Sequence, residues 1–299
     1  MLVSIIVQLL DEEVWMNDWV KEKLHVGYGQ SFLPKNLVYS NDSEFQRIDI
    51  IDTDLWGRVM LLDGIVQTTE KDEFIYHEMF AHVPMFAHAE ASTVLIVGGG
   101  DGGLLREVLK HKSVKKVVLV EIDKAVIDLC SQYFPGHSLN SWQDPRVEVV
   151  IADGKDYIAT TELTFDLILS DSTDPIGPGE VLFTSDFYYQ AISKLTDKGI
   201  LVTQNGVSFL QTGELEQTYV RMKQYAKYNG FYHANVPTYI GGNMSFAWAS
   251  NGIDCSSLSH DVIATRSNDS NIATSYYNAQ IHSASFAQPN YLKNMLEAG

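Results

Sequence analysis

The stretch Val94-Leu95-Ile96-Val97-Gly98-Gly99-Gly100-Asp101-Gly102-Gly103 decides the fold of this chain, because an apolar, strand-like run leads directly into a glycine loop. Glycines after a buried strand let backbone amides approach a nucleotide closely, and such a loop ordinarily attracts anions. Asp101 places a negative charge in this loop. The stretch therefore predicts a nucleotide-binding α/β fold whose ligand is a nucleoside with a cationic tail.

After Lys71 the sequence alternates between apolar runs and helix-length segments, which is typical of a mostly parallel sheet covered on both faces. The predicted strands span residues 93–97, 116–120, 147–151, 165–169, 199–204, 231–236 and 244–249. The predicted helices span residues 104–110, 124–133, 185–195 and 214–228. This pattern indicates a doubly wound, Rossmann-like domain of methyltransferase type over residues 71–299.

The residues before this domain have a different pattern. Short apolar runs at 37–39, 45–51 and 59–62 are separated by turn signals, and Asp63-Gly64 indicates a hairpin. We therefore expect a small antiparallel β domain within residues 1–70. The apolar start of the chain, within residues 1–14, is either a packed strand or a poorly ordered leader.

Composition narrows the possible ligands and locations. The 299 residues carry a net charge of −17, which repels nucleic acid and anionic membranes and attracts small cations. Residues 1–10 lack a basic region and are too short to span a bilayer. The only cysteines, Cys130 and Cys255, predict a cytoplasmic protein without a structural disulfide. The chain has no HExxH or Cys/His spacing for a metal and no GxSxG elbow for a serine hydrolase.

Acidic residues follow four successive predicted strands of the parallel sheet. They are Asp101, Glu121, Asp153, Asp171 and Asp174, and Gln204 ends the next strand. Ligands bind beyond the carboxyl ends of such strands, so we expect these side chains to converge on one rim. A single acid in this position is more often a helix cap, but capping alone poorly explains the whole series.

Individual positions on this rim indicate individual contacts. Glu121 lies about 20 residues after the glycine loop, the spacing of an acid that binds ribose hydroxyls. Asp153 could accept a hydrogen bond from an adenine amino group, or it could cap the helix that begins near Lys155. Asp171 and Asp174 lie close together in sequence, and a cation such as a diamine between them would relieve their repulsion.

Three long motifs resemble the polyamine aminopropyltransferases, in particular the bacterial spermidine synthases. The motifs are residues 62–79, 98–107 and 171–178, and the similarity extends from Trp19 to Leu292. The resemblance implies transfer of an aminopropyl group from decarboxylated S-adenosylmethionine to putrescine. It implies no cofactor beyond this co-substrate, and it implies a homodimer or homotetramer, which exposed β edges in the N-terminal sheet would also favour.

The resemblance also implies a role for each matching residue. Asp171 is implied as the catalytic acid–base residue, supported by Tyr76. The implied donor site comprises Gln46, Tyr76, Gly98, Gly100, Asp101, Glu121, Asp153, Gly154 and Asp171. The implied putrescine site comprises Tyr76, His77, Asp171, Asp174, Gln204 and Tyr239, with a lid loop at Pro175, Gly177 and Pro178. His77 stands where some relatives carry glutamine.

The chemistry of the reactants agrees with these roles. An alkylammonium has a pKa of about 10.4 and must lose a proton before it can attack, which requires a base such as Asp171. Asp101 would repel the carboxylate of ordinary S-adenosylmethionine and accept the decarboxylated form. Two alternatives remain: a putrescine N-methyltransferase on the same scaffold, which Asp101 disfavours, and a non-catalytic polyamine-binding protein, which Asp171 and Tyr76 disfavour.

Overall fold

The computed structural model describes residues 19–22 and 24–298, so the prediction for residues 1–14 lies outside the described residues. The chain separates into two compact units. The first comprises Met1–Glu73 and Pro237–Ile240, and the second comprises Phe74–Val236 and Gly241–Gly299. The first unit therefore includes a short segment, Pro237–Ile240, that is distant in sequence from the rest of that unit.

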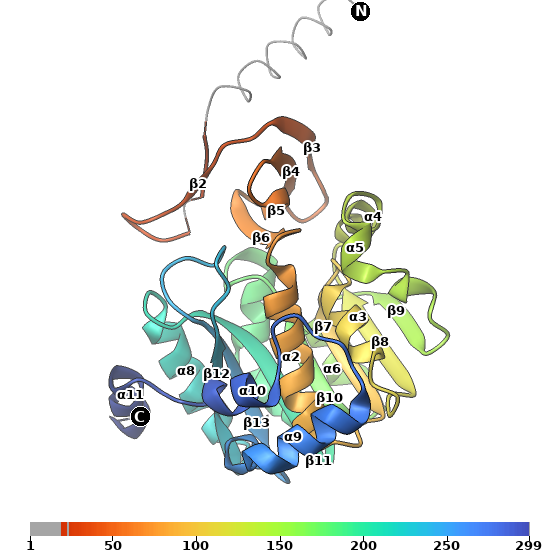
Figure 1. Ribbon diagram of the computed structural model, residues 1–299, viewed down its shortest axis with the longest axis vertical. Helices are drawn as coiled ribbons and strands as arrows, with labels where there is room; N and C mark the ends of the chain where they lie inside the picture. The colour runs from red at the N-terminus through yellow and green to blue at the C-terminus, as the bar shows by residue number, and fades with distance from the viewer. Residues whose placement is uncertain (1–18, 23, 299) are drawn as a thin grey trace, which may run out of the picture. The chain divides into compact units, whose positions relative to one another are not determined.

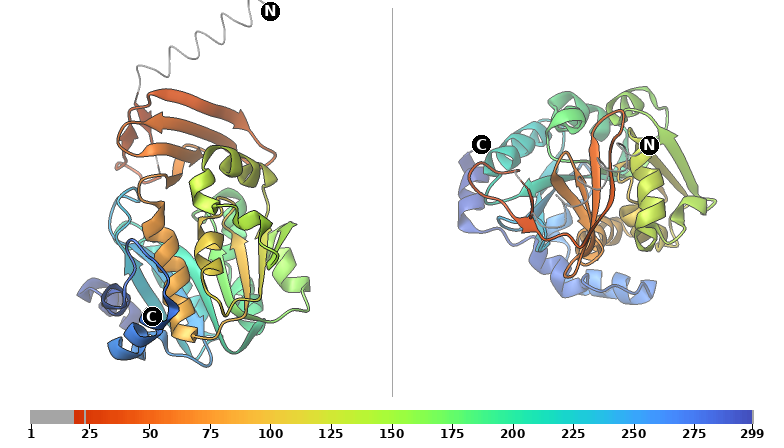
Figure 2. Two further views of the ribbon diagram at one scale, coloured as in Figure 1. Left: turned by 45° about the vertical axis from the view of Figure 1, so that its right-hand side comes forward. Right: turned by 90° about the horizontal axis from the view of Figure 1, so that it is seen from above.

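The first unit is built on a four-stranded antiparallel sheet (Figure 2). Its strands, in chain order and spatial order, are β3 (Asn36–Asp42), β4 (Arg47–Thr53), β5 (Gly57–Leu62) and β6 (Ile65–Thr69), and a separate pair joins β1 (Val20–Lys21) to β2 (Ser31–Phe32). Leu62 pairs with Ile65 across Asp63-Gly64, which confirms the predicted hairpin. Val59 and Leu61 alternate along β5 and enter the small core of this unit.

A seven-stranded sheet forms the centre of the second unit (Figure 1). Its strands are β7 (Thr93–Gly98), β8 (Lys116–Glu121), β9 (Val147–Ile151), β10 (Phe165–Asp171), β11 (Leu195–Val207), β12 (Tyr228–Ala234) and β13 (Met244–Ser250). The spatial order is β12-β13-β11-β10-β7-β8-β9. The five strands from β11 to β9 in this order are parallel, and β13 and β12 pair antiparallel. This confirms the predicted doubly wound, mostly parallel α/β fold.

Helices cover both faces of this sheet (Figure 2). They are α2 (Glu73–His88), α3 (Gly103–Leu109), α4 (Lys124–Tyr133), α5 (Pro135–Ser138), α6 (Gly154–Thr160), α7 (Ser185–Ser193), α8 (Thr212–Lys223), α9 (His260–Ser270), α10 (Ala279–Ser285) and α11 (Asn290–Ala298). Leu95 and Val97 of β7 share one core with Phe187 of α7 and Leu215 of α8. Among the described residues, none of the helices has the length and apolar character needed to cross a bilayer.

Several elements differ from the sequence prediction. The pattern did not indicate α2, because residues 75–87 are buried all around and leave no polar face, and Pro84 lies inside the helix. The helix expected over 214–228 was wrong at its end, since α8 stops at Lys223 and Tyr228 already pairs with Ser250. Leu195, expected at the end of a helix, begins β11. Pairing with neighbouring strands overrides local propensity at these positions.

Candidate active site

The glycine loop connects β7 to α3 and is fastened to the end of β10. Gly98 has a φ of +81°, and a Cβ built there would lie 2.0 Å from the carbonyl oxygen of Asp171, so a larger residue does not fit. The backbone N–H of Gly99 donates to the same carbonyl oxygen at 2.9 Å. The loop that begins with Gly98 therefore lies directly against the residue expected to act as the base.

Asp171, the last residue of β10, is hydrogen-bonded to Tyr76 of α2. The Tyr76 hydroxyl donates to Asp171 Oδ1 at 2.6 Å, and the Tyr76 ring is held edge-on against Phe80 and tilted against Phe246. Burial, with a further contribution from the negative charge of Asp101, raises the pKa of Asp171 to about 6. This carboxylate is a stronger base than an exposed aspartate and is still largely ionised at neutral pH.

Asp101 lies at the start of α3 and is paired with a histidine. Its Oδ1 accepts from the Gly103 N–H at 2.8 Å, and its Oδ2 lies 3.3 Å from His77 Nε2. Burial acts to raise the pKa of Asp101, but the charge and hydrogen bond of His77 outweigh it and hold that pKa well below its usual range. Asp101 is thus a stable anion, and its charge acts on Asp171 across the same loop.

Glu121 and Asp153 follow the next two strands. Glu121 is buried at the end of β8 and accepts from the Asp123 N–H at 3.0 Å, and burial raises its pKa to about 7. Asp153 accepts from the Lys155 N–H at 2.7 Å and caps α6, which is one of the two roles weighed from the sequence. Gly100 lies beside the Glu121 carboxylate, and Gly154 begins α6.

Two glutamines hold the segment that follows Asp171. Gln204 donates from Nε2 to the Thr173 carbonyl at 2.9 Å, and its Oε1 accepts from the Gly206 N–H at 2.9 Å. Gln211 donates from Nε2 to Asp174 Oδ1 at 2.7 Å. No signal in the sequence identifies Gln211, because only the folded chain brings residue 211 next to residue 174.

The carboxylates that repel each other are not the pair that the sequence predicts. The sequence suggested crowding between Asp171 and Asp174. In the structure the like charge that raises the pKa of Asp171 is Asp101, and the one that raises the pKa of Glu214, after burial, is Asp174. The repulsion therefore acts between Asp101 and Asp171 and between Asp174 and Glu214, not between Asp171 and Asp174.

The predicted lid residues open a 3-10 helix, η2 (Gly177–Phe183), with Gly177 and Pro178 at its start. Pro175 lies within the turn in which the Ile176 N–H donates to the Asp174 carbonyl at 2.6 Å. This hydrogen bond fixes the backbone between Asp174 and the start of η2. Ile176 exposes 55% of its surface.

Two predicted site residues, Gln46 and Tyr239, belong to the first unit. The Gln46 N–H donates to Ser43 Oγ at 3.1 Å in the turn before β4. The Tyr239 hydroxyl donates to the Gln67 carbonyl at 2.5 Å, which ties the segment Pro237–Ile240 to β6.

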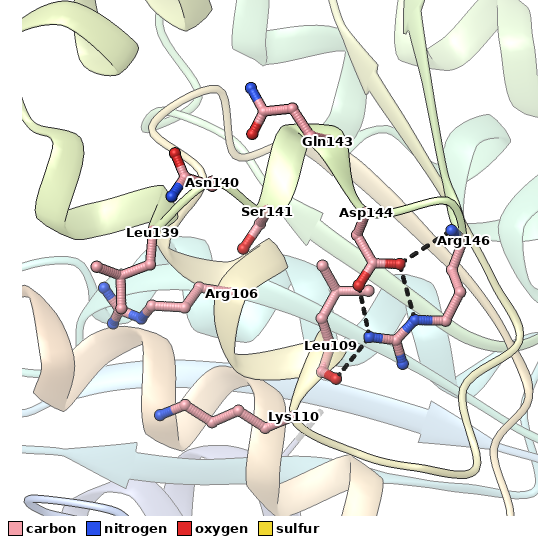
Figure 3. A pocket seen from close by; sticks show the side chains of 9 residues that line it. All are labelled: Arg106, Leu109, Lys110, Leu139, Asn140, Ser141, Gln143, Asp144 and Arg146. Carbon is pink, nitrogen blue, oxygen red and sulfur yellow. Dashed lines mark hydrogen bonds and ion pairs between the residues drawn. The ribbon is translucent and has the colours of Figure 1, made fainter.

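A separate pocket of about 400 Å³ lies near the end of α3 (Figure 3). It is lined by Arg106, Leu109, Lys110, Leu139, Asn140, Ser141, Gln143, Asp144 and Arg146. Its cationic groups are compensated, since Arg146 pairs with Asp144 at 2.8 Å while Arg106 and Lys110 pair with Glu107 at 2.7 and 2.6 Å. Within residues 19–22 and 24–298, no three His, Cys, Asp or Glu side chains are grouped so as to hold a metal ion.

Known proteins match both units of the chain. Residues 73–257 match the spermine/spermidine synthase domain, and residues 18–70 match the spermidine synthase tetramerisation domain. Polyamine aminopropyltransferase 1 of Pseudomonas aeruginosa is 51% identical over 277 residues, which cover 93% of this chain and 96% of that protein.

Solved structures agree with these matches. A spermidine synthase in complex with the transition state analogue AdoDATO has a TM-score of 0.90 and 40% identity, covering 95% of this chain and 96% of that one. The spermidine synthase of Thermotoga maritima has a TM-score of 0.86 and 39% identity, covering 94% of each chain.

The glycine loop after β7 and the carboxylates that follow the parallel strands are features of a Rossmann-like enzyme domain. The matches confirm the resemblance read from the sequence. The chain belongs to the spermine/spermidine synthase family.

Proposed function

We propose that this chain transfers the aminopropyl group of decarboxylated S-adenosylmethionine to putrescine, giving spermidine and 5′-methylthioadenosine. The observation that carries the proposal is the 2.6 Å hydrogen bond from Tyr76 to Asp171, whose pKa is raised to about 6 beside the glycine loop. The names of the relatives, polyamine aminopropyltransferase and spermidine synthase, support the same reaction.

Asp171 would act as the base for the acceptor amine. It binds the ammonium of putrescine, accepts one proton, and leaves a neutral nitrogen beside the donor. The nitrogen lone pair forms a C–N bond to the propyl carbon next to sulfur while the C–S bond breaks. The electron pair of that bond stays on sulfur, so the sulfonium becomes the neutral thioether of methylthioadenosine.

Donor recognition is assigned to the carboxylates around the glycine loop. Asp101 would bind the ammonium of the aminopropyl arm and repel the additional carboxylate of S-adenosylmethionine. Glu121 would accept hydrogen bonds from the ribose hydroxyls. Asp153 would accept a hydrogen bond from the adenine amino group through Oδ2, since Oδ1 caps α6. Gly98, Gly100 and Gly154 would admit the nucleoside close to the backbone, and Gln46 would complete the donor site.

Acceptor recognition is assigned to a set of side chains around the amine, with Pro175, Gly177 and Pro178 as a lid. The set comprises Tyr76, His77, Asp171, Asp174, Gln204 and Tyr239. The contact between His77 and Asp101 supports a second role for His77, because this imidazole adjusts the charge that the donor arm meets.

The assembly and location proposed for the chain follow from its first unit and its substrates. The match of residues 18–70 to a tetramerisation domain supports a homodimer or homotetramer formed through this unit. We place the enzyme in the cytoplasm, with decarboxylated S-adenosylmethionine as a co-substrate and no other cofactor.

Mass spectrometry of the products tests the reaction. Incubation with decarboxylated S-adenosylmethionine and putrescine should give spermidine and methylthioadenosine in equal amounts. A methylated diamine with S-adenosylhomocysteine, formed from S-adenosylmethionine, would instead identify a methyltransferase. Binding of both substrates without turnover would identify a binding protein.

A further inference from the structure

Gln211 is the residue directly before α8, but its side chain does not cap this helix. Its side chain makes no capping hydrogen bond, and glutamine is not among the preferred cap residues. The residue is nevertheless only 7% exposed. A buried amide that does not serve its own helix must be satisfied elsewhere.

The amide of Gln211 links three other groups. Its Oε1 accepts from the Val207 N–H at 2.7 Å, while its Nε2 donates to Asp174 Oδ1 at 2.7 Å and to Glu214 Oε2 at 3.1 Å. These partners fix the orientation of the amide, because a flipped amide would turn its oxygen toward two carboxylates and its NH2 toward an N–H. Only an amide can accept on one side and donate twice on the other.

The backbone around Gln211 leaves room for this amide. Gly206 has a φ of +63°, and a Cβ built there would lie 2.4 Å from Gln211 Oε1. The N–H of this same glycine donates to Gln204, whose Nε2 holds the Thr173 carbonyl. Residues 204–211 thus direct two amide groups at the segment that carries Asp174.

The charges joined by Gln211 would otherwise repel each other. Burial, together with the charge of Asp174, raises the pKa of Glu214 to about 7. The two N–H groups of Gln211 offset part of this repulsion and leave both carboxyls in place for a cation.

We propose that Gln211 is a positioning residue for acceptor specificity, which orients Asp174 and holds Glu214 beside it for the second ammonium of the acceptor. The inference rests on the proposed function, since it takes Asp174 as a contact of the diamine. It adds that Glu214 and Gln211 distinguish diamines from monoamines, whereas Asp171 acts on the reacting nitrogen of either.

Steady-state kinetics with two acceptors test this role. Putrescine carries two ammonium groups, and 1-aminobutane has the same carbon chain with only one. In Gln211→Met, kcat/KM for putrescine should fall about 10- to 100-fold, mainly through KM, because a hydrogen bond to a charged group is lost. The value for 1-aminobutane should stay unchanged. Gln217→Met is the matched control, because this exposed glutamine of α8 accepts from Arg221 in the same helix.

A structural role for Gln211 would lower turnover of both acceptors equally, and that result, or no loss at all, would overturn the inference. Gln211→Glu retains an acceptor for Val207 but loses both donors, so it decides the question if the methionine variant does not fold. Glu214→Gln should show the same selectivity, because it removes one of the two negative charges that meet the second ammonium. A wild-type enzyme that forms no spermidine would remove the proposed function as well, whereas an active wild type with equal losses would remove only this inference.

Discussion

Two buried glutamates of the second unit, Glu107 and Glu121, have opposite electrostatic surroundings. Burial would raise the pKa of Glu107, but hydrogen bonds from His82 and Lys110 and the charge of Arg106 hold it well below its usual range. Burial raises the pKa of Glu121 to about 7, and the charges of Asp123 and Asp171 act in the same direction. Fixed cations hold the first carboxyl as an anion, while burial and neighbouring carboxylates favour the protonated form of the second.

The surroundings of Glu107 show what a satisfied carboxylate requires. His82 Nε2 lies 3.0 Å from Glu107 Oε2, and its Nδ1 lies 2.9 Å from His111 Nε2. Arg106 continues the network by donating to the carbonyl of His137 at 2.7 Å. Asp101 has surroundings similar to those of Glu107, because, despite burial, a histidine holds the pKa of each carboxyl below its usual range. Asp171 differs from both, because its pKa is raised. The proposed active site therefore combines one stable anion with several carboxyls whose pKa lies near neutral pH.

Removing the base should have the largest effect. Asp171→Asn should lower kcat by about 10²- to 10⁴-fold and leave the fold intact, because the neutral amide cannot accept the proton. Product formation under saturating substrates measures this loss. Near-normal turnover would exclude Asp171 as the base.

Removing the negative charge of Glu107 should destabilise the folded protein. Glu107→Gln should lower the free energy of unfolding by about 3–5 kcal/mol, because Arg106, Lys110 and His82 lose their buried counter-charge. Urea unfolding of the ligand-free protein measures this loss of stability. Lys124→Ala is a control, because its pair with Asp128 is exposed and should contribute less than about 1 kcal/mol. Equal effects of the two substitutions would contradict the assigned difference.

Donor discrimination should depend on Asp101. Asp101→Asn should narrow the preference for decarboxylated over ordinary S-adenosylmethionine by about 100-fold, since the repulsion of the donor carboxylate is lost. Titration calorimetry with both donors gives the ratio. His77→Gln keeps the Asp101 charge and should change the ratio less; an unchanged ratio in Asp101→Asn would count against repulsion.

The smallest expected effect concerns stability. The pKa of Glu121 in the folded chain is about 7, above the ordinary value of about 4.3, so its contribution to stability is lost as pH rises through 7. Glu121→Gln should therefore raise Tm at pH 8 by a few degrees, on the order expected for 1 kcal/mol or more, and have little effect at pH 4, where this carboxyl is largely protonated in both states. A lower Tm at pH 8 would show that the ionised carboxylate stabilises the empty site.

The rim of carboxylates could be predicted from the sequence because it depends on a general property of parallel sheets. The ends of buried strands are recognisable as the points where apolar runs stop, and ligands bind beyond those ends. This property alone places Asp101, Glu121, Asp153 and Asp171 at one edge. The role of Tyr76 beside Asp171 came from the resemblance, because α2 gives no amphipathic signal.

The contacts of His77 and Gln211 could not be predicted from local sequence. Each depends on packing between distant segments, His77 with residue 101 and Gln211 with residue 174, and neither segment shows a spacing that signals the contact. The pKa shifts have the same origin, since burial is their leading cause.

Protons released on putrescine binding test the central claim most directly. Titration calorimetry in buffers of different ionisation enthalpy, with methylthioadenosine present, counts them. Asp171 and Glu214, with pKa values of about 6 and 7, should together release about one proton at pH 6.5 and almost none at pH 8.5 as a diammonium ligand ionises them. No release at either pH would contradict the account, because these carboxyls would then already be ionised or would not meet the ligand.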